Sequence, residues 1–199
     1  MSVIRHPSSA ILSPLFTEET PMAKRPSARA KTVSWQDTLY QKLREHGVTQ
    51  FSYVPDAGHS RLIDLSLADP DVQSIALTTE EEGVALAAGA DLGGARAVLM
   101  MQSSGAGNCV NFFSMMVTGQ FPFLTLVSMR GDFGEGNPWQ MGMGQAVQPV
   151  LEAMGIQCVR IEHPDEIPGA AEAAATMAFK TEQQVAVLLT QKLIGAKSF

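Results

Sequence analysis

The sequence has 199 residues and a mass of 21.3 kDa, which is the size of one ordinary domain with tails. Its hydrophobic fraction of 45% is enough to bury a core and excludes a disordered chain. The net charge of −6 argues against a nucleic-acid-binding protein, and no apolar run reaches the roughly 18 residues that a membrane span needs. Charged residues make up only 17%, with eleven methionines and seventeen glycines, so we expect an oligomeric domain with much of its surface covered.

Two cysteines, Cys109 and Cys158, are too few for a disulfide framework and lack the spacing of metal ligands. We therefore expect no metal site in this chain and a reducing, cytoplasmic compartment. The first residues lack the apolar stretch and cleavage site of a secretory signal. Residues 1–33 are rich in proline and serine, which predicts a flexible N-terminal extension or, alternatively, an arm that wraps a neighbouring subunit.

From Ser34 onward the pattern becomes regular. Ser34 and Asp37 form a weak capping box in front of an amphipathic helix that ends at Gly47. Apolar runs of strand length then alternate with helical stretches. We predict six strands, at 50–54, 72–78, 97–102, 123–128, 157–161 and 184–189. The helices between them are predicted at 60–68, 81–93, 107–118, 146–154 and 165–180.

The predicted strands are continuously apolar and are separated by helical crossovers, which favours a parallel sheet covered on both faces. Right-handed crossovers then give a three-layer α/β/α sandwich with a six-stranded parallel sheet, formed by residues 34–199. In this fold, ligands bind at the carboxyl ends of the strands. Four segments are expected there: 54–59, 78–82, 102–108 and 129–143.

The segment 102–108 has the most informative pattern. Gly105 and Gly107 allow a ligand to approach the backbone closely, and the helix that follows directs its amide dipoles at the loop. A Rossmann fingerprint fails because Val110 stands where the third glycine is required. A ligand-binding loop and a simple tight turn at a helix start are the two interpretations.

Three glutamates, Glu80, Glu81 and Glu82, follow the second predicted strand and open a helix. Acids in the first helical turn complement the macrodipole, but three of them at the ligand edge exceed what capping needs. The helix behind them, 83–90, consists mainly of small residues that pack closely. We therefore predict a carboxylate in a water-poor setting, able to exchange a proton with a ligand nitrogen.

The remaining two segments, 54–59 and 129–143, contain candidate acidic, basic and cationic side chains. Asp56 and His59 are candidate acid/base or substrate-binding groups, or else an Asx-turn residue and a solvated histidine. Arg130, at the end of a strand, could clamp an anionic substrate or form a surface ion pair.

Taken together, these segments resemble the pyrimidine-binding domain of thiamine-diphosphate enzymes, and in particular the α subunits of sulfopyruvate decarboxylase and the N-terminal half of phosphonopyruvate decarboxylase. The resemblance covers residues 34–195. The motifs that carry it are Val-Pro-Asp at 54–56, a glutamate-led Val-Ala-Leu-Ala-Ala-Gly at 84–89, Met-Gln-Ser-Ser-Gly-Ala-Gly-Asn at 101–108 and Met-Arg-Gly-Asp at 129–132.

The resemblance implies an enzyme: a thiamine-diphosphate-dependent decarboxylase of a small anionic 2-oxoacid such as sulfopyruvate or phosphonopyruvate. In the family, one glutamate contacts the aminopyrimidine nitrogen N1′. Glu80 is favoured because Gly89 stands nine positions on, whereas the Glu-x-Gly pattern of related synthases selects Glu81. The other cofactor-binding residues implied are Pro55, Asp56, Gly105, Gly107 and Asn108. The substrate-binding residues implied are His59, Gln102, Ser103 and Arg130.

The resemblance also implies a partner. Family members hold the diphosphate and Mg²⁺ with a Gly-Asp-Gly motif and a downstream asparagine, but here Phe133 follows Gly131-Asp132. We therefore expect a β subunit that supplies the diphosphate and Mg²⁺ site, in a hetero-oligomer of α2β2 or larger. Ser103 replaces the family's usual asparagine, which weakens the case for sulfopyruvate in particular. A carboligase or lyase subunit, or a non-catalytic regulatory or assembly subunit, is the alternative.

Overall fold

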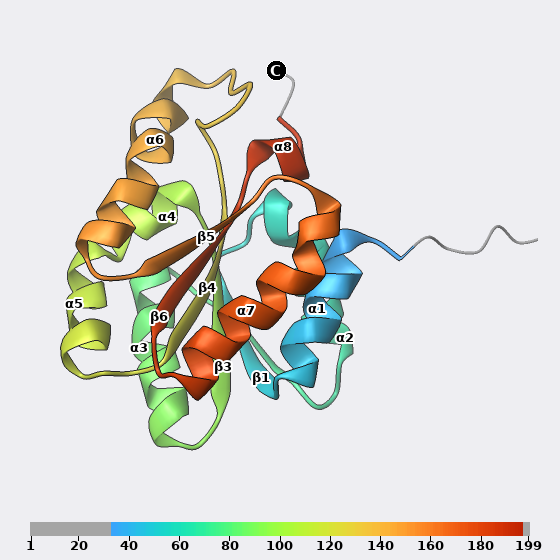
Figure 1. Ribbon diagram of the computed structural model, residues 1–199, viewed down its shortest axis with the longest axis vertical. Helices are drawn as coiled ribbons and strands as arrows, with labels where there is room; N and C mark the ends of the chain where they lie inside the picture. Colours follow the sequence, from blue (N-terminus) through green and yellow to red (C-terminus); the bar gives the residue numbers. More distant parts are fainter. Residues whose placement is uncertain (1–32, 197–199) are drawn as a thin grey trace, which may run out of the picture. The chain divides into compact units, whose positions relative to one another are not determined.

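The computed structural model describes residues 33–196, which form one six-stranded sheet with helices on both sides (Figure 1). The strands run in the order β2-β1-β3-β4-β6-β5, and every neighbouring pair is parallel. Their bounds are β1 Val48–Tyr53, β2 Gln73–Ala76, β3 Arg96–Gln102, β4 Phe123–Ser128, β5 Gln157–Ile161 and β6 Gln184–Leu189. The predicted three-layer α/β/α sandwich is confirmed.

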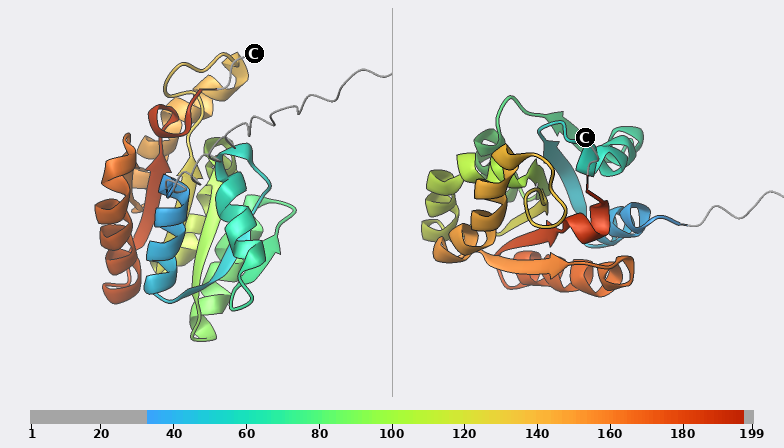
Figure 2. Two further views of the ribbon diagram at one scale, coloured as in Figure 1. Left: turned by 90° about the vertical axis from the view of Figure 1, so that its right-hand side faces the viewer. Right: turned by 90° about the horizontal axis from the view of Figure 1, so that it is seen from above.

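The helices divide between the two faces of the sheet, as the view from above shows most clearly (Figure 2). One face is covered by α3 (Glu80–Leu92), α4 (Ser103–Asn108), α5 (Val110–Thr118) and α6 (Pro138–Ala153). The other is covered by α1 (Trp35–Glu45), α2 (Ser60–Ala68) and α7 (Ile167–Lys180). Short helical turns complete the described chain: η1 (Ala57–His59), η2 (Pro164–Glu166) and α8 (Gln191–Ile194).

The central strand β3 shows why the strands are continuously apolar. Val98 and Met100 pack toward α1, α2 and α7, whereas Leu99 and Met101 pack toward the opposite helices. All four side chains have no exposed area. Because successive strand residues point to opposite faces, a strand covered on both sides must be apolar at every position.

Two elements differ from the sequence-based expectation. The segment 102–108 is not a loop: α4 begins at Ser103, directly after β3, and α5 follows at Val110. The last part of 129–143 is also helical, since α6 begins at Pro138 rather than at residue 146. Asn137 Oδ1 caps this helix by accepting a hydrogen bond from Trp139 N at 3.1 Å, and proline suits the first helical turn.

The start of the described chain agrees with the predicted capping box. Asp37 N donates to Ser34 Oγ at 3.1 Å, and Ser34 N donates to Asp37 Oδ2 at 3.2 Å. Apart from Val33, the expected extension 1–33 lies outside the described residues, so its boundary with the domain at 34–199 stays a prediction. Between residues 33 and 196, no helix is both long enough and apolar enough to cross a membrane.

Candidate functional site

Glu80, Gly105 and Asn108 meet where the first residue of α3 lies against α4; we call this group the glutamate corner. Glu80 is the first residue of α3 and is only 9% exposed. Asn108 Nδ2 donates to its Oε2 at 3.0 Å. A Cβ added to Gly105 would lie 2.3 Å from Glu80 Oε1, so α4 can approach the carboxylate only because this position has no side chain.

The second oxygen of Glu80 is the distinctive feature of this corner. Within residues 33–196, hydrogen bonding to the Glu80 side chain goes to Oε2 alone, which leaves Oε1 as an available acceptor. A nearly buried carboxylate with an unused acceptor is suited to bind a donor nitrogen of a ligand. Three residues that the sequence analysis drew from two separate segments are therefore brought together.

The two following glutamates have different surroundings. Glu81 is partly exposed and accepts a hydrogen bond from the Thr79 hydroxyl, which holds the pKa of its carboxyl below the usual value. Glu82 is exposed, and its Oε2 accepts a hydrogen bond from Thr78 N at 3.0 Å. Both are bonded to the segment just before their own helix, as acids that cap a helix are. Only Glu80 faces α4.

Asp56 is the centre of a second polar group at the carboxyl edge of the sheet. Its Oδ2 accepts hydrogen bonds from Ser128 Oγ at 2.6 Å and from Gly58 N at 3.0 Å, and its Oδ1 accepts one from Gln102 Nε2 at 3.2 Å. These donors come from the ends of β4 and β3 and from η1. A cavity of about 190 Å³ opens beside them. Its lining consists of Asp56, Ala57, Gly58, Ser128, Arg130, Ile194, Gly195 and Ala196.

Arg130 also lines this cavity, but it is not the free clamp or surface ion pair that the sequence suggested. Its Nε and Nη2 donate to Glu135 at 2.7 and 2.8 Å, and both residues are buried. Gln191 Nε2 donates to the same carboxylate at 3.0 Å. We call Arg130, Glu135 and Gln191 the arginine cluster. The hydrogen bonds from Arg130 lower the pKa of Glu135 to about 2, against the effect of burial.

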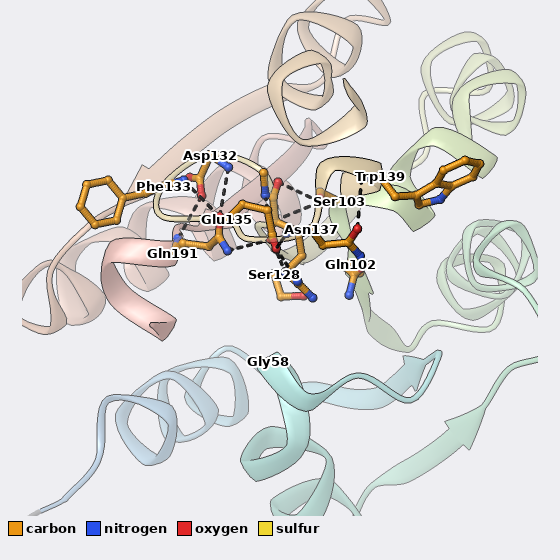
Figure 3. Close-up of polar contacts among 12 residues, drawn as sticks. Gly58, Gln102, Ser103, Ser128, Asp132, Phe133, Glu135, Asn137, Trp139 and Gln191 are labelled. Atoms are coloured by element: carbon orange, nitrogen blue, oxygen red, sulfur yellow. Dashed lines mark hydrogen bonds and ion pairs between the residues drawn. The ribbon is translucent and has the colours of Figure 1, made fainter. Parts of the chain in front are cut away.

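Figure 3 shows the arginine cluster and the loop around it. Gln191 Oε1 accepts hydrogen bonds from Asp132 N and Phe133 N, both at 3.1 Å, so α8 holds the loop that follows β4. The side chains of Phe133 and Trp139 point away from the cluster on opposite sides (Figure 3) and are 54% and 89% exposed.

Two predicted substrate residues lie in the interior. His59 has no exposed area, and its Nε2 lies 3.1 Å from the Met101 carbonyl oxygen. Burial lowers the pKa of His59, which keeps the ring neutral. Ser103 is equally buried, and its Oγ accepts a hydrogen bond from Arg130 N at 3.1 Å. His59 thus connects η1 with β3, and Ser103 connects the start of α4 with the loop after β4. The alternative prediction that His59 is solvated is wrong.

The remaining predicted residues, Pro55 and Gly107, do not line the cavity beside Asp56. Pro55 is exposed at the entrance of the turn after β1. Gly107 faces α6 rather than open space, since a Cβ there would lie 3.0 Å from Met143 Sδ. Cys109, between α4 and α5, has no exposed area; burial first, and Glu80 second, raise the pKa of its thiol far above the usual range.

Sequence reasoning missed Ser128, Gly58, Glu135 and Gln191. Ser128 and Gln191 could have been found, because they stand at the ends of β4 and β6, where the strand-end rule places ligands. Glu135 lies in the segment 129–143 that the same rule placed at this edge, but nothing in the pattern singled it out. Its burial follows from the turn that returns it to Arg130, five residues earlier.

In the part of the chain that the structure describes, no group of three or more histidine, cysteine, aspartate or glutamate side chains could hold a metal ion. Asp132, the acid of the Gly-Asp-Phe segment, pairs with Arg160 Nη2 at 2.8 Å. Its carboxylate is therefore engaged within the chain.

Several known proteins are similar in sequence to this chain. No family model matches the sequence. The sulfopyruvate decarboxylase subunit alpha of Methanococcus maripaludis is 34% identical over 154 residues, covering 77% of this chain and 92% of that protein. The corresponding subunit of Methanocaldococcus jannaschii is 32% identical over 151 residues, covering 75% and 89%. Phosphonopyruvate decarboxylase of Streptomyces viridochromogenes is 30% identical over 152 residues, 75% of this chain but 38% of that protein.

Among solved structures, a 2-oxoglutarate:ferredoxin oxidoreductase from Magnetococcus marinus superimposes with a TM-score of 0.67 at 14% identity, covering 81% of this chain and 29% of that one. This likeness concerns the fold alone, a parallel sheet with helices on both sides of the kind found in thiamine-diphosphate enzymes. Within that class, the identities to the archaeal subunits are decisive. The chain belongs to the family of sulfopyruvate decarboxylase α subunits.

Proposed function

We propose that this chain is the pyrimidine-binding α subunit of a thiamine-diphosphate-dependent decarboxylase that acts on a small anionic 2-oxoacid such as sulfopyruvate or phosphonopyruvate. Family membership supports the reaction. The observation that carries the role of this chain is the glutamate corner, where Glu80 is nearly buried and keeps Oε1 available.

The residues of the corner fit the aminopyrimidine of thiamine diphosphate. Glu80 Oε1 can share a proton with a ring nitrogen, which is itself an acceptor until it is protonated, and Asn108 fixes the carboxyl group through Oε2. Gly105 keeps α4 against the carboxylate and so limits its contact with water. When bound, thiamine diphosphate supplies an electron-accepting ring for cleavage of the bond to the carboxylate carbon. In this proposal Glu80 holds and releases a proton at Oε1, and Glu81 caps the helix.

The cavity beside Asp56 is the proposed place of the substrate. Conversion of a 2-oxoacid anion to an aldehyde and carbon dioxide consumes one proton, so a titratable group near the substrate is useful. Asp56 lines the cavity and is held in place by Ser128 and Gln102. It is the group we propose to deliver that proton.

The partner completes the proposal. The charge of Arg130 is largely offset by Glu135, so we propose that cations of a β subunit bind most of the substrate's acidic end. The same subunit would hold the diphosphate and Mg²⁺, in an assembly of α2β2 or larger, and the chain would be active only within it. The name "subunit alpha" of the relatives supports a partner. The cytoplasmic location stays a prediction from the sequence.

Two neighbouring glutamates give a matched test. In the complex with its partner, Glu80→Gln should lower kcat for sulfopyruvate at least about a hundredfold, the usual scale for loss of a proton-transferring group. Glu81→Gln should change kcat less than about threefold, because its hydroxyl partner Thr79 can donate equally to an amide oxygen. Carbon dioxide release is the measurement, and size-exclusion chromatography checks assembly.

The outcomes separate the alternatives. Equal losses in both variants, or a larger loss in Glu81→Gln, would remove the role assigned to Glu80. A wild-type complex that joins two carbonyl compounds but releases no carbon dioxide would make the chain a carboligase subunit. A complex with neither activity would leave a regulatory or assembly subunit.

A further inference from the structure

The cavity proposed for the substrate is small and is closed at one end. Its volume is about 190 Å³, which is below the roughly 300–1,000 Å³ of pockets that hold drug-sized ligands. Two of its lining residues, Ser128 and Arg130, are buried, whereas Ala57, Gly195 and Ala196 are exposed. The cavity therefore has a closed end where β4 ends and an open end toward solvent, and its volume suits a short acid.

The closed end of the cavity is rigid. A Cβ added to Gly58 would lie 2.8 Å from Ser128 Cβ, so the turn after β1 is already in close contact with the end of β4. Ser128 Oγ donates to Asp56 Oδ2 at 2.6 Å, which ties the same two segments together. Arg130 is held by its two hydrogen bonds to Glu135. In so closely packed a region, a larger ligand cannot gain room by pushing these side chains aside.

Ile194, the last residue of α8, belongs to the opposite wall. Among the lining residues that the structure describes, it has the largest apolar side chain. It is half-buried and also packs against the core on the side of α1, α2 and α7. A β-branched side chain has few rotamers, so Ile194 forms a stiff apolar surface. Such a surface suits contact with the methylene group of a short 2-oxoacid.

The short helix that carries Ile194 is itself held in place. Gln191, its first residue, is 1% exposed. Its side chain accepts hydrogen bonds from Asp132 N and Phe133 N, both at 3.1 Å, and donates one to Glu135 at 3.0 Å. Its backbone N donates to Asp132 Oδ1 at 3.3 Å. Because one residue joins α8 to the loop after β4 so extensively, Ile194 cannot retreat from a larger ligand by a movement of the helix.

From this geometry we propose that Ile194 is a specificity-determining residue of the cavity. It limits the substrate to 2-oxoacids whose third carbon carries the acidic group and no other substituent. The inference rests on the proposed function, because it requires the substrate to occupy this cavity. Cations of the β subunit bind most of the acidic end in that proposal, so Ile194 selects by size and not by charge.

The test compares sulfopyruvate with its 3-methyl homologue, 2-oxo-3-sulfobutanoate, in the assembled complex. Both acids have the same charge and the same spacing between carboxylate, carbonyl and sulfonate, so the added methyl group is the difference between them. The measurement is kcat/KM for carbon dioxide release from each acid. The wild-type complex should prefer sulfopyruvate at least about tenfold, the usual discrimination against one additional carbon in an apolar pocket.

Two substitutions of Ile194 should widen the cavity by different amounts. Ile194→Ala removes more volume than the methyl group adds, so the preference for sulfopyruvate should fall about tenfold. Ile194→Val removes a single carbon and keeps the β-branched shape, so the preference should fall about threefold. In both variants kcat/KM should rise for the homologue relative to sulfopyruvate, which a uniform loss of activity would not produce.

Leu193→Ala is the matched control. Leu193 precedes Ile194 in α8, is also half-buried and packs against the same core, but it does not line the cavity. Its truncation should lower stability about as much as Ile194→Ala does and leave the preference between the two acids unchanged. An equal change of preference in Leu193→Ala would mean that loosening of α8 causes the effect, which would overturn the proposal.

The two levels of inference fail differently. A wild-type complex that releases no carbon dioxide from sulfopyruvate would refute the proposed function and the inference with it. An active wild-type complex that accepts both acids equally, or whose preference persists in both Ile194 variants, would refute the role of Ile194 alone. Ile194→Val removes so little that it decides the question even where Ile194→Ala fails to assemble.

Discussion

The glutamate corner and the arginine cluster each contain a nearly buried glutamate, at 9% exposed for Glu80 and 8% for Glu135. Glu135 accepts hydrogen bonds from five donors: Arg130 Nε and Nη2, Gly131 N, Asn137 N and Gln191 Nε2. Glu80 accepts one from the described residues, through Oε2. The two residues are similarly exposed, so the difference lies in their hydrogen bonds. Glu80 keeps an oxygen available for a ligand, whereas Glu135 uses its carboxylate to hold a loop.

Gly144→Ala should have the largest effect and disrupts the arginine cluster from outside. A Cβ at this position would lie 1.8 Å from the Arg130 carbonyl oxygen, and a backbone atom cannot move away cheaply. We expect the free energy of unfolding to fall by about 3 kcal/mol. Urea denaturation measures it. Gly142→Ala, two residues earlier in α6 with nothing within 4 Å, should instead be neutral or stabilising by about 0.5–1 kcal/mol. Equal losses in both variants would contradict the packing argument.

Gly105→Ala disrupts the glutamate corner while sparing the fold. The added Cβ would meet the Glu80 carboxylate, a side-chain end that can shift, so we expect catalysis to suffer more than stability. The kcat of the complex should fall about a hundredfold, equivalent to about 2.7 kcal/mol, with unfolding changed by less than about 1 kcal/mol. Gly169→Ala, on α7 with open space around it, should keep full activity. Unchanged kcat in Gly105→Ala would show that Glu80 needs no exact placement.

Glu135→Gln tests the arginine cluster through the pH dependence of the protein's stability. Because the folded-state pKa of Glu135 is lowered from 4.5 to about 2, its contribution to stability is complete above the ordinary value and is lost as pH falls toward 2. At pH 7 the variant should be less stable by about 2 kcal/mol, since Arg130 would lose its charged partner.

The difference between the variant and wild type should shrink between pH 4.5 and 2, as urea denaturation at several pH values would reveal. Glu162→Gln is the control, because its ion pairs with Arg160 and Lys192 are at the surface, where screening makes such pairs weak. A pH-independent difference for Glu135→Gln would contradict the lowered pKa.

Much of the fold could be predicted from the sequence because burial on both faces forces the central strands to be largely apolar, whereas the edge strand β5 keeps exposed Gln157 and Arg160. The runs at 123–128, 157–161 and 184–189 coincide with β4, β5 and β6. The start of α4 could not be predicted, because Ser-Ser-Gly-Ala-Gly-Asn has low helix propensity. Packing decides there: Gly105 fits against Glu80 and Gly107 against Met143.

For the candidate site, strand ends were predictable and side-chain pairings were not. The rule for parallel sheets brought Glu80, Gly105 and Asn108 to one edge, and their contacts agree with it. The partner of Arg130 depends on the path of a loop containing Gly131 and Gly134, both with positive φ. That path determines that Glu135 turns inward, which no residue pattern reveals.

The cysteines have a practical consequence. Burial raises the pKa of Cys109 far above its usual range and that of Cys158 to about 11, so both thiols stay protonated at neutral pH and react slowly with maleimides. Because the sequence has two cysteines, a third introduced as Trp139→Cys would be the fast-reacting one. A fluorophore attached there would report whether docking of the second subunit shields the tip of α6 from solvent.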